Sequence, residues 1–281
     1  MTASATKIKL RGAARMIACW LWVGRATPSV LWQSIVGDIR YRLTQLGIPS
    51  RTAKDIAEVR AAFDAHAANG QFQERWFDVN IVPWCLTFPK VFSRTDPVRI
   101  LEIGSWEGRS SLFFLTYFTK GSLTAVDTWL GGDEWEYNAT DDLSDLEARF
   151  DGNVAPHAER LTKRKGSSLQ VLPQMLNEDL KFDIIYVDGS HLADDVLTDA
   201  INAWRLLEQG GILIFDDVTA PFYLRMRANP AWAINSFLRY HKGSYKILQA
   251  GLQQVILEKT KEFADPLDTE LAGLFQVSSG S

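Results

Sequence analysis

The sequence predicts an α/β fold in which helices surround a mostly parallel sheet that ends in an antiparallel hairpin. From Pro97 onward, short apolar runs alternate with stretches of helical periodicity, which is the pattern of βαβ units. Near the C-terminus, Ala250-Gly251 separates two short apolar segments, as in a hairpin turn. Before Pro97 the pattern is helical. We therefore expect a helical region over residues 1–96, an α/β domain over 97–260 and a tail over 261–281.

Five parallel strands and the hairpin make seven predicted strands, and helices fill the intervals. The strands are Val98–Ile103, Ser122–Val126, Arg160–Lys165, Phe182–Val187 and Gly211–Phe215, followed by the hairpin segments Tyr245–Gln249 and Gln253–Glu258. The helices are Ser110–Phe118, Asp141–Phe150, Leu169–Leu176, Ala193–Leu207 and Ala231–Tyr240.

The first 96 residues are expected to cover the substrate site or to form an oligomer contact. Val30–Leu46 and Thr52–Ala68 are predicted helices, because they have helical periodicity or are rich in helix formers. The aromatic segment Trp76–Phe92 contains two prolines, and we expect it to bridge to the α/β domain or to cover its site.

The composition is that of an ordinary folded domain and argues against a nucleic-acid-binding protein. The 281 residues are 46% hydrophobic and 23% charged, as in ordinary folded domains. The net charge of −4 leaves no broad basic footprint, so nucleic acid is not an expected partner. Cys19 and Cys85 are far apart and lack metal-type spacing, which fits a reducing cytoplasm.

A basic stretch precedes a short apolar run, Met16–Val23, near the N-terminus. The run is too short to span a membrane, and no small-residue cleavage site follows it. We expect a buried or amphipathic surface helix. The alternative is peripheral contact with a membrane, in which a basic flank would act beside tryptophans. The residues concerned are Lys7, Lys9, Arg11 and Arg15, with Trp20, Trp22 and Trp32.

The clearest binding motif is RILEIGSWEGRSS over residues 99–111, where an apolar strand runs into a glycine turn that opens a helix. Gly104 lets a ligand approach the main chain at the carboxyl end of the strand. The dinucleotide fingerprint requires glycine where Trp106 stands, which argues against a bound pyrophosphate and favours S-adenosylmethionine. A plain tight turn is the alternative. The expected cofactor-binding residues of the motif are Glu102, Gly104, Ser105 and Gly108.

Two further segments follow the next strands in register with this motif. Asp127 ends the second predicted strand, 23 positions after Gly104, where an acid can accept hydrogen bonds from both ribose hydroxyls. Thr128 is expected to contact the cofactor beside it. Ser167, in the Gly-Ser-Ser turn after the third strand, is expected near the adenine, although such a turn is also common as a helix cap.

Acidic residues and a histidine follow the fourth and fifth strands. Asp188 and His191 follow the fourth, and Asp216-Asp217 follow the fifth. Because these strands are neighbours in a doubly wound sheet, the three carboxylates should share one mouth, and a hard cation such as Mg²⁺ would relieve their repulsion. The alternatives are a helix capped by Ser190, a solvated Asp216-Asp217 turn and a histidine without a chemical role.

A longer pattern over Val98–Val218 resembles a known family. Its residues are the run Phe182–His191, Asp199, Ala203-Trp204, Gly210-Gly211 and Ile214–Asp217. The pattern is similar to methyltransferase family 24, a group of class I, Rossmann-like S-adenosylmethionine-dependent enzymes related to macrocin-type sugar O-methyltransferases.

The resemblance implies an O-methyltransferase whose acceptor is a sugar, a glycan or another hydroxylated small molecule. It implies that Asp188, Asp216 and Asp217 hold Mg²⁺, that Asp188 also takes part in catalysis and lies against the cofactor, and that His191 is the general base. Catechol-type relatives usually carry asparagine where Asp217 stands, so the sugar enzymes match better.

Two other functions remain open from the sequence. One is a nicotinamide-dependent Rossmann enzyme, which Trp106 disfavours; the other is a non-catalytic cofactor-binding module, which has no need of Asp188 and His191. The acidic, aromatic segment Trp129–Tyr137 is interpreted either as a lid over the acceptor or as a plain surface loop.

Overall fold

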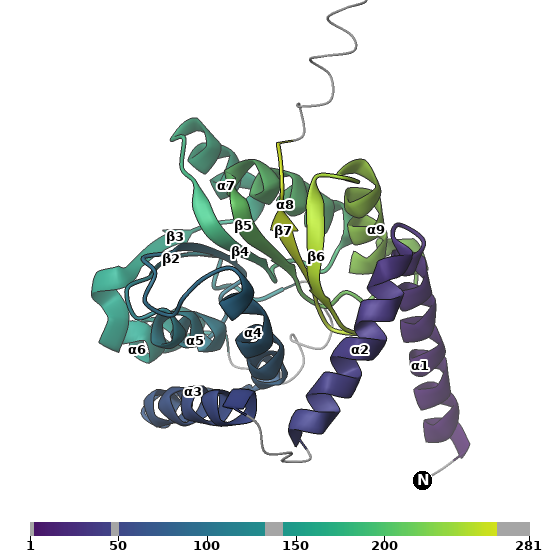
Figure 1. Cartoon of the computed structure of the whole chain (residues 1–281), viewed down its shortest axis with the longest axis horizontal. Helices are drawn as coiled ribbons and strands as arrows, with labels where there is room; N and C mark the ends of the chain where they lie inside the picture. The colour runs from purple at the N-terminus through teal and green to yellow at the C-terminus, as the bar shows by residue number, and fades with distance from the viewer. Residues whose placement is uncertain (1–2, 46–50, 133–142, 263–281) are drawn as a thin grey trace, which may run out of the picture.

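The predicted fold class is confirmed by a seven-stranded sheet with the order β3-β2-β1-β4-β5-β7-β6. The computed structural model describes residues 3–45, 51–132 and 143–262 (Figure 1). Five strands are parallel, and β7 pairs antiparallel with both β5 and β6. The strands are β1 Arg99–Ile103, β2 Ser122–Asp127, β3 Leu161–Lys165, β4 Phe182–Val187, β5 Leu207–Phe215, β6 Tyr245–Ala250 and β7 Val255–Lys259.

Helices cover both faces of the sheet, as a largely parallel sheet requires. The α-helices are α1 Ala3–Gly24, α2 Pro28–Gln45, α3 Arg51–Ala67, α4 Ile81–Thr87, α5 Arg109–Tyr117, α6 Leu146–Val154, α7 Ser168–Asn177, α8 Ala193–Leu206 and α9 Pro230–Tyr240. The 3-10 helices are η1 Trp76–Asn80, η2 Phe88–Lys90, η3 Ala155–Arg160 and η4 Met226–Ala228. Residues of α7, α8 and α9 share one hydrophobic cluster with the sheet, and residues of α3, α4 and α5 share the other.

The N-terminal helical region shares its core with the sheet. Trp84 of α4 is fully buried, and its ring lies 4.5 Å from that of Phe114 and 5.0 Å from that of Tyr186, measured between centroids. Its indole N–H donates to Gln254 Oε1 at 2.7 Å. The aromatic segment predicted to bridge or cover is therefore helical, and it packs directly against the α/β elements.

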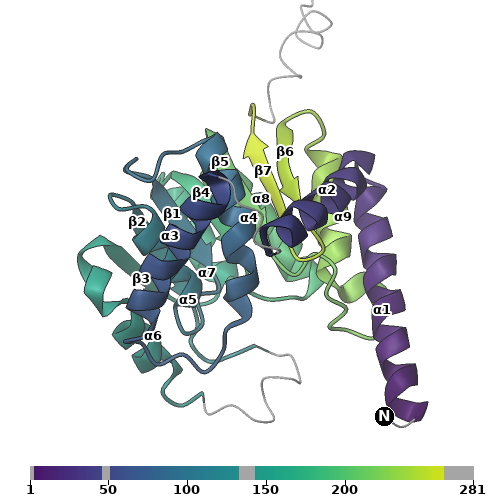
Figure 2. The ribbon, with the colours of Figure 1, turned by 60° about the horizontal axis from the view of Figure 1, so that its bottom comes forward.

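Helices α1 and α2 stand together at the β6 end of the sheet (Figures 1 and 2). Trp22 of α1 stacks on Trp232 of α9, with ring centroids 4.9 Å apart. Gly37 of α2 lies so close to β6 that a Cβ atom there would be 2.8 Å from the carbonyl oxygen of Ala250. Helix α2 thus lies against the last strand of the sheet.

Two predicted elements had wrong boundaries. The fifth strand begins at Leu207 rather than Gly211, because Leu207 pairs with Phe182 across a register shift. A Cβ atom at Gly211 would lie 2.8 Å from the carbonyl oxygen of Asp183, so this glycine allows a close approach of two strands. The helix expected over Asp141–Phe150 begins at Leu146 and ends at Val154.

Some predictions lie partly outside the described residues. These are most of the Trp129–Tyr137 lid, the first residues of the helix just named and nearly all of the C-terminal tail. Among the residues that the structure describes, no helix is both long and apolar enough to cross a membrane. Cys19 and Cys85 are free and buried.

Candidate active site

One large cavity opens where β1, β2, β4 and β5 end. Its volume is about 1010 Å³, at the upper end of the range for small-molecule sites, so it has room for two ligands. Nine of the eleven site residues predicted from the sequence line it: Gly104, Ser105, Asp127, Thr128, Ser167, Asp188, His191, Asp216 and Asp217. Glu102 and Gly108 are absent from its lining.

The loop after β1 has a backbone that only glycine permits at one point. Gly104 has φ +86°, and a Cβ atom there would lie 1.9 Å from the carbonyl oxygen of Asp188. Gly108 has φ +79° at the start of α5. These constraints explain the two glycines of the motif.

The carboxylate of Asp127 holds this loop. Its Oδ2 accepts the backbone N–H groups of Ser105 and Trp106 at 2.7 and 2.8 Å, and its Oδ1 accepts that of Trp129 at 2.7 Å. A carboxylate has about four lone-pair positions, so Asp127 retains acceptor capacity toward the cavity. Asp127 therefore both fixes the loop and presents an acceptor to the cavity that it lines.

Glu102 lies beneath the loop rather than in the cavity. Its side chain is fully buried and accepts a hydrogen bond from the Ser111 hydroxyl. Burial raises the pKa of Glu102 to about 7, although hydrogen bonds from the neighbouring serine hydroxyls oppose this rise. Its position fits support of the loop better than contact with a ligand.

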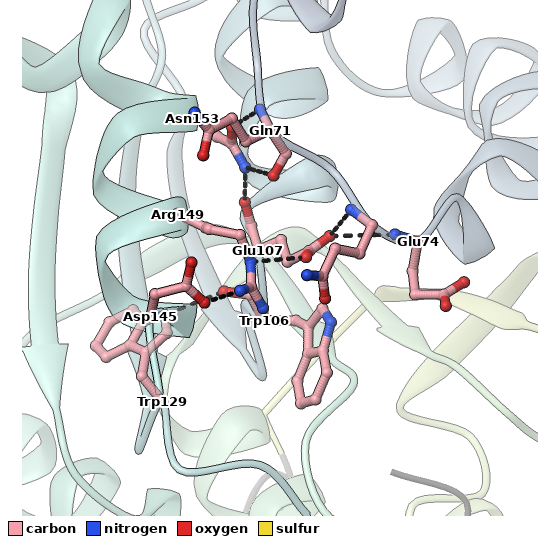
Figure 3. Close-up of polar contacts among 9 residues, drawn as sticks. Gln71, Glu74, Trp106, Glu107, Trp129, Asp145, Arg149 and Asn153 are labelled. Atoms are coloured by element: carbon pink, nitrogen blue, oxygen red, sulfur yellow. Dashed lines mark hydrogen bonds and ion pairs between the residues drawn. The ribbon is translucent and has the colours of Figure 1, made fainter. Parts of the chain in front are cut away.

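A network around the buried side chains of Glu107, Arg149 and Asn153, which we call the Glu107 clamp, joins the loop to the segment that runs from Gln71 to the end of η1 (Figure 3). Glu107 Oε2 accepts the backbone N–H groups of Gln73 and Glu74 at 2.8 and 3.2 Å, and Oε1 accepts Arg149 Nε at 3.0 Å. Asn153 bonds to the N–H and the carbonyl of Gln71 and also to the carbonyl of Glu107. The clamp comprises Gln71, Gln73, Glu74, Glu107, Arg149 and Asn153.

A second ion pair fixes the same segment on its other side. Arg109 of α5 makes a two-pronged contact with Asp78, at 2.6 and 2.9 Å, while its guanidinium lies over the rings of Phe63 and Phe72. The segment thereby forms one wall of the cavity, to which Trp76 and Asn80 contribute. Sequence reasoning did not identify these contacts, because nothing in the local pattern joins residues so far apart.

The acidic end of the cavity is crowded. The Tyr186 hydroxyl contacts the carboxylates of Asp188, at 2.7 Å, and of Asp216. Burial, and then repulsion from Asp216 and Asp217, raise the pKa of Asp188 well above its ordinary value. Burial and repulsion from Asp217 raise the pKa of Asp216 to about 6. The grouping of three carboxylates predicted from the sequence is therefore present.

Asp216 differs from the other two carboxylates in its partners. Its Oδ2 accepts Asn80 Nδ2 at 3.0 Å and Gln254 Nε2 at 2.9 Å, besides Tyr186, and its Oδ1 accepts the backbone N–H of Asp217. The three residues whose potential ligand atoms all lie within 4.8 Å of one another are Asp188, His191 and Asp217. Asp216 lies next to this group, with protein donors on both of its oxygens.

His191 is held on two sides. Its Nε2 lies 3.0 Å from Asp217 Oδ2, and its ring stacks on that of Phe222 with centroids 4.0 Å apart. The residue is 8% exposed. His191 thus has a fixed orientation within the lining of the cavity.

Neither Ser190 nor Ser167 caps the helix that follows it through its side chain. Leu192, and not Ser190, is the N-cap of α8, and the Ser190 hydroxyl donates to Asp195 at 2.8 Å. Ser167 does occupy the N-cap position of α7, but its side chain makes no capping hydrogen bond. Both serines line the cavity.

Residues 101–218 match the family described as "Methyltransferase domain", family 24, which confirms the resemblance inferred from the sequence. The O-methyltransferase hkm8 of Aspergillus hancockii is 28% identical over 188 residues, which are 65% of this chain and 62% of that protein. This chain therefore aligns with less than two thirds of the relative's length.

The fold is similar to that of solved methyltransferases. The MycE methyltransferase of the mycinamycin biosynthetic pathway, solved with Mg and SAH, superposes with a TM-score of 0.50 and 15% identity, covering 81% of this chain and 60% of that one. An O-methyltransferase from Bacillus cereus, solved with SAH, gives a TM-score of 0.47 and 18% identity, covering 83% of this chain and 100% of that one. At 15% identity, the likeness to MycE concerns the fold alone.

Proposed function

We propose that the protein transfers the methyl group of S-adenosylmethionine to a hydroxyl group of a sugar or another hydroxylated small molecule, because residues 101–218 match the methyltransferase family 24. The observation that carries this proposal is the single cavity lined by Asp127 after β2 and by Asp188, His191 and Asp217 after β4 and β5. The relative from Aspergillus hancockii is an O-methyltransferase, which supports oxygen as the acceptor atom.

The donor side of the cavity fits a nucleoside without phosphates. Gly104 brings the main chain to the cavity, and Asp127 offers an acceptor to ribose hydroxyls. Trp106 occupies the place where a pyrophosphate-binding loop needs glycine, which weighs against the nicotinamide alternative. A binding titration that compares S-adenosylmethionine with NAD separates the two functions.

The acceptor side fits a divalent cation. The carboxylates of Asp188 and Asp217 and the imidazole of His191 converge within 4.8 Å. Burial, and then repulsion from Asp216 and Asp217, raise the pKa of Asp188, and a cation would relieve that repulsion. Asp188 and Asp217 would hold Mg²⁺, and Asp216 would lie next to the ion. When bound, Mg²⁺ lowers the pKa of a coordinated hydroxyl group and so favours its ionised form.

In the proposed reaction, His191 removes the acceptor proton. In the transfer, the acceptor oxygen attacks the methyl carbon, the bond between that carbon and sulfur breaks, and the hydroxyl proton passes to the imidazole. The carboxylate of Asp217, 3.0 Å from His191 Nε2, stabilises the imidazolium that results. Phe222 and Asp217 fix the ring in position, which supports in-line geometry.

A methyl-transfer screen tests the proposed function. The full-length protein is incubated with S-adenosylmethionine labelled in its methyl group and with sugars, phenols and polyketides that carry free hydroxyl groups. Label should appear on an acceptor oxygen, and Asp188→Asn should abolish its incorporation. Tight binding of S-adenosylmethionine without transfer to any class of acceptor would instead favour the non-catalytic module.

Replacing Asp127 with alanine is expected to weaken S-adenosylmethionine binding by about 1.5–3 kcal/mol, because hydrogen bonds to a charged group are lost. Isothermal calorimetry measures the effect. Asp127→Asn is the matched variant: it keeps one acceptor oxygen for the Ser105 and Trp106 N–H groups, so it should bind more tightly than the alanine variant. Unchanged affinity in Asp127→Ala would remove Asp127 from the cofactor site.

A further inference from the structure

Helices α1 and α2, which we call the N-terminal hairpin, carry a set of exposed apolar side chains, which we call the apolar stripe. Six of the fourteen exposed large apolar side chains in the described part of the protein belong to it, each 44–67% exposed. They are Ile17 and Leu21 of α1, with Trp32, Ile35, Ile39 and Leu43 of α2. The four on α2 recur at spacings of three, four and four, so they lie along one face of that helix.

The opposite sides of both helices are already occupied. On α1, Cys19 and Val23 are buried, and the Trp22 carbonyl accepts Asn235 Nδ2 of α9. On α2, Val30 is buried and Gly37 lies against the Ala250 carbonyl of β6. The stripe is therefore the part of the hairpin that the rest of the described chain leaves to solvent.

The hairpin is basic in an otherwise acidic protein. Residues 1–45 contain seven lysines and arginines and one acidic residue, Asp38, a net charge of +6, whereas the whole chain carries −4. Arg11, Arg25 and Arg42 are exposed. Exposed apolar side chains that include a tryptophan, on helices rich in basic residues, are typical of helices that lie in the interface of a membrane.

We propose that the N-terminal hairpin binds the surface of an anionic lipid bilayer, with Trp32, Ile35 and Ile39 inserted among the headgroups and the arginines close to lipid phosphates. A symmetric contact with a second copy is disfavoured, because it would bring two hairpins of charge +6 together. Charge attracts the hairpin to anionic lipid, while the acidic remainder of the chain is repelled and stays in solution. The proposal is independent of the methyl-transfer reaction.

The structure also corrects the sequence-based view of which tryptophans take part. Trp22 is stacked on Trp232 and Trp20 is half-buried, so of the three expected near the membrane Trp32 alone is exposed. The stripe on α2 is the larger part of the surface.

Vesicle flotation with the full-length protein tests the proposal. Vesicles of phosphatidylcholine with about 30% phosphatidylserine should carry the protein, whereas vesicles of phosphatidylcholine alone should carry little. Raising the salt from about 0.1 M to about 0.5 M should weaken binding, since screening shortens the reach of the arginines.

Matched variants identify the surface. Ile35→Asp with Ile39→Asp should lower the vesicle-bound fraction about tenfold, because the aspartates neither insert nor are attracted by anionic lipid. Ile201→Asp, at another exposed isoleucine but on α8, should leave binding unchanged. Arg11→Gln with Arg42→Gln should reduce binding to anionic vesicles only. The thermal midpoint and S-adenosylmethionine affinity, measured for each variant, show that the fold is intact.

Three outcomes overturn the proposal. One is no flotation with anionic vesicles, and another is flotation that the Ile35 and Ile39 substitutions leave unchanged. The third is a dimer, detected by light scattering, that the same substitutions dissociate while no vesicle binding is seen; this assigns the stripe to a second copy of the chain.

Discussion

Removal of divalent cations is expected to lower methyl transfer by about three orders of magnitude, since a bound cation supplies several kcal/mol of charge stabilisation at such sites. EDTA should abolish the activity, and Mg²⁺ or Mn²⁺ in excess should restore it, because oxygen ligands suit hard cations. Without a cation, the half-buried carboxylates of Asp188, Asp216 and Asp217 repel one another, and this repulsion adds to the effect of burial in raising the pKa of Asp188.

The control for this prediction is a variant that loses the cation but not the donor. Asp188→Asn should abolish the calorimetric signal of Mg²⁺ binding, and Asp127→Ala should leave that signal in place. Asp216→Asn tests the ligand set, because the Asp216 oxygens already accept protein donors from Tyr186, Asn80 and Gln254. Full activity in excess chelator would exclude the cation and leave proton removal to His191 alone.

The sequence predicted best what depends on neighbours in the chain. The strands that end at Ile103 and Val187 were located correctly, because each is a mostly apolar run that leads into a glycine-containing or acidic loop. The close approach at Gly104 and the position of Asp127 follow from the same local order. Parallel strands end at one edge of the sheet, so the residues that follow them necessarily meet.

Contacts between distant segments left no such pattern. Glu107 holds the backbone of Gln73, 34 positions earlier, and Asn80 reaches Asp216 across 136 positions. Both depend on how α3 and α4 pack on the sheet, which propensity and periodicity do not specify. The same reason explains why the fifth strand begins earlier than predicted. Leu207 pairs with Phe182, a contact with a distant segment, whereas the prediction began the strand at Gly211.

Replacing His191 with alanine is expected to lower turnover by about 10²–10⁴-fold, the usual contribution of a general base. S-adenosylmethionine affinity should stay close to that of the wild type, because the base acts on the acceptor hydroxyl. Phe222→Leu is the matched control: it removes the ring that stacks on His191 but keeps the imidazole and its contact with Asp217, so turnover should fall far less. The turnover of both variants is measured as the rate of methyl transfer at a saturating concentration of S-adenosylmethionine.

The pH profile separates a general base from a residue that only supports the fold. A base must be neutral to accept a proton, so a rate that depends on histidine falls as the pH drops below neutrality. In the cation-free protein, burial and repulsion from Asp217 raise the pKa of Asp216 to about 6. Protonation of Asp216 below that pH opposes cation binding, which should produce a second loss of rate. The histidine limb should therefore vanish in His191→Ala, while the loss due to Asp216 remains. If His191→Ala keeps both its rate and the full acidic limb, His191 does not take the proton, and the ionisation of the acceptor must depend on the cation.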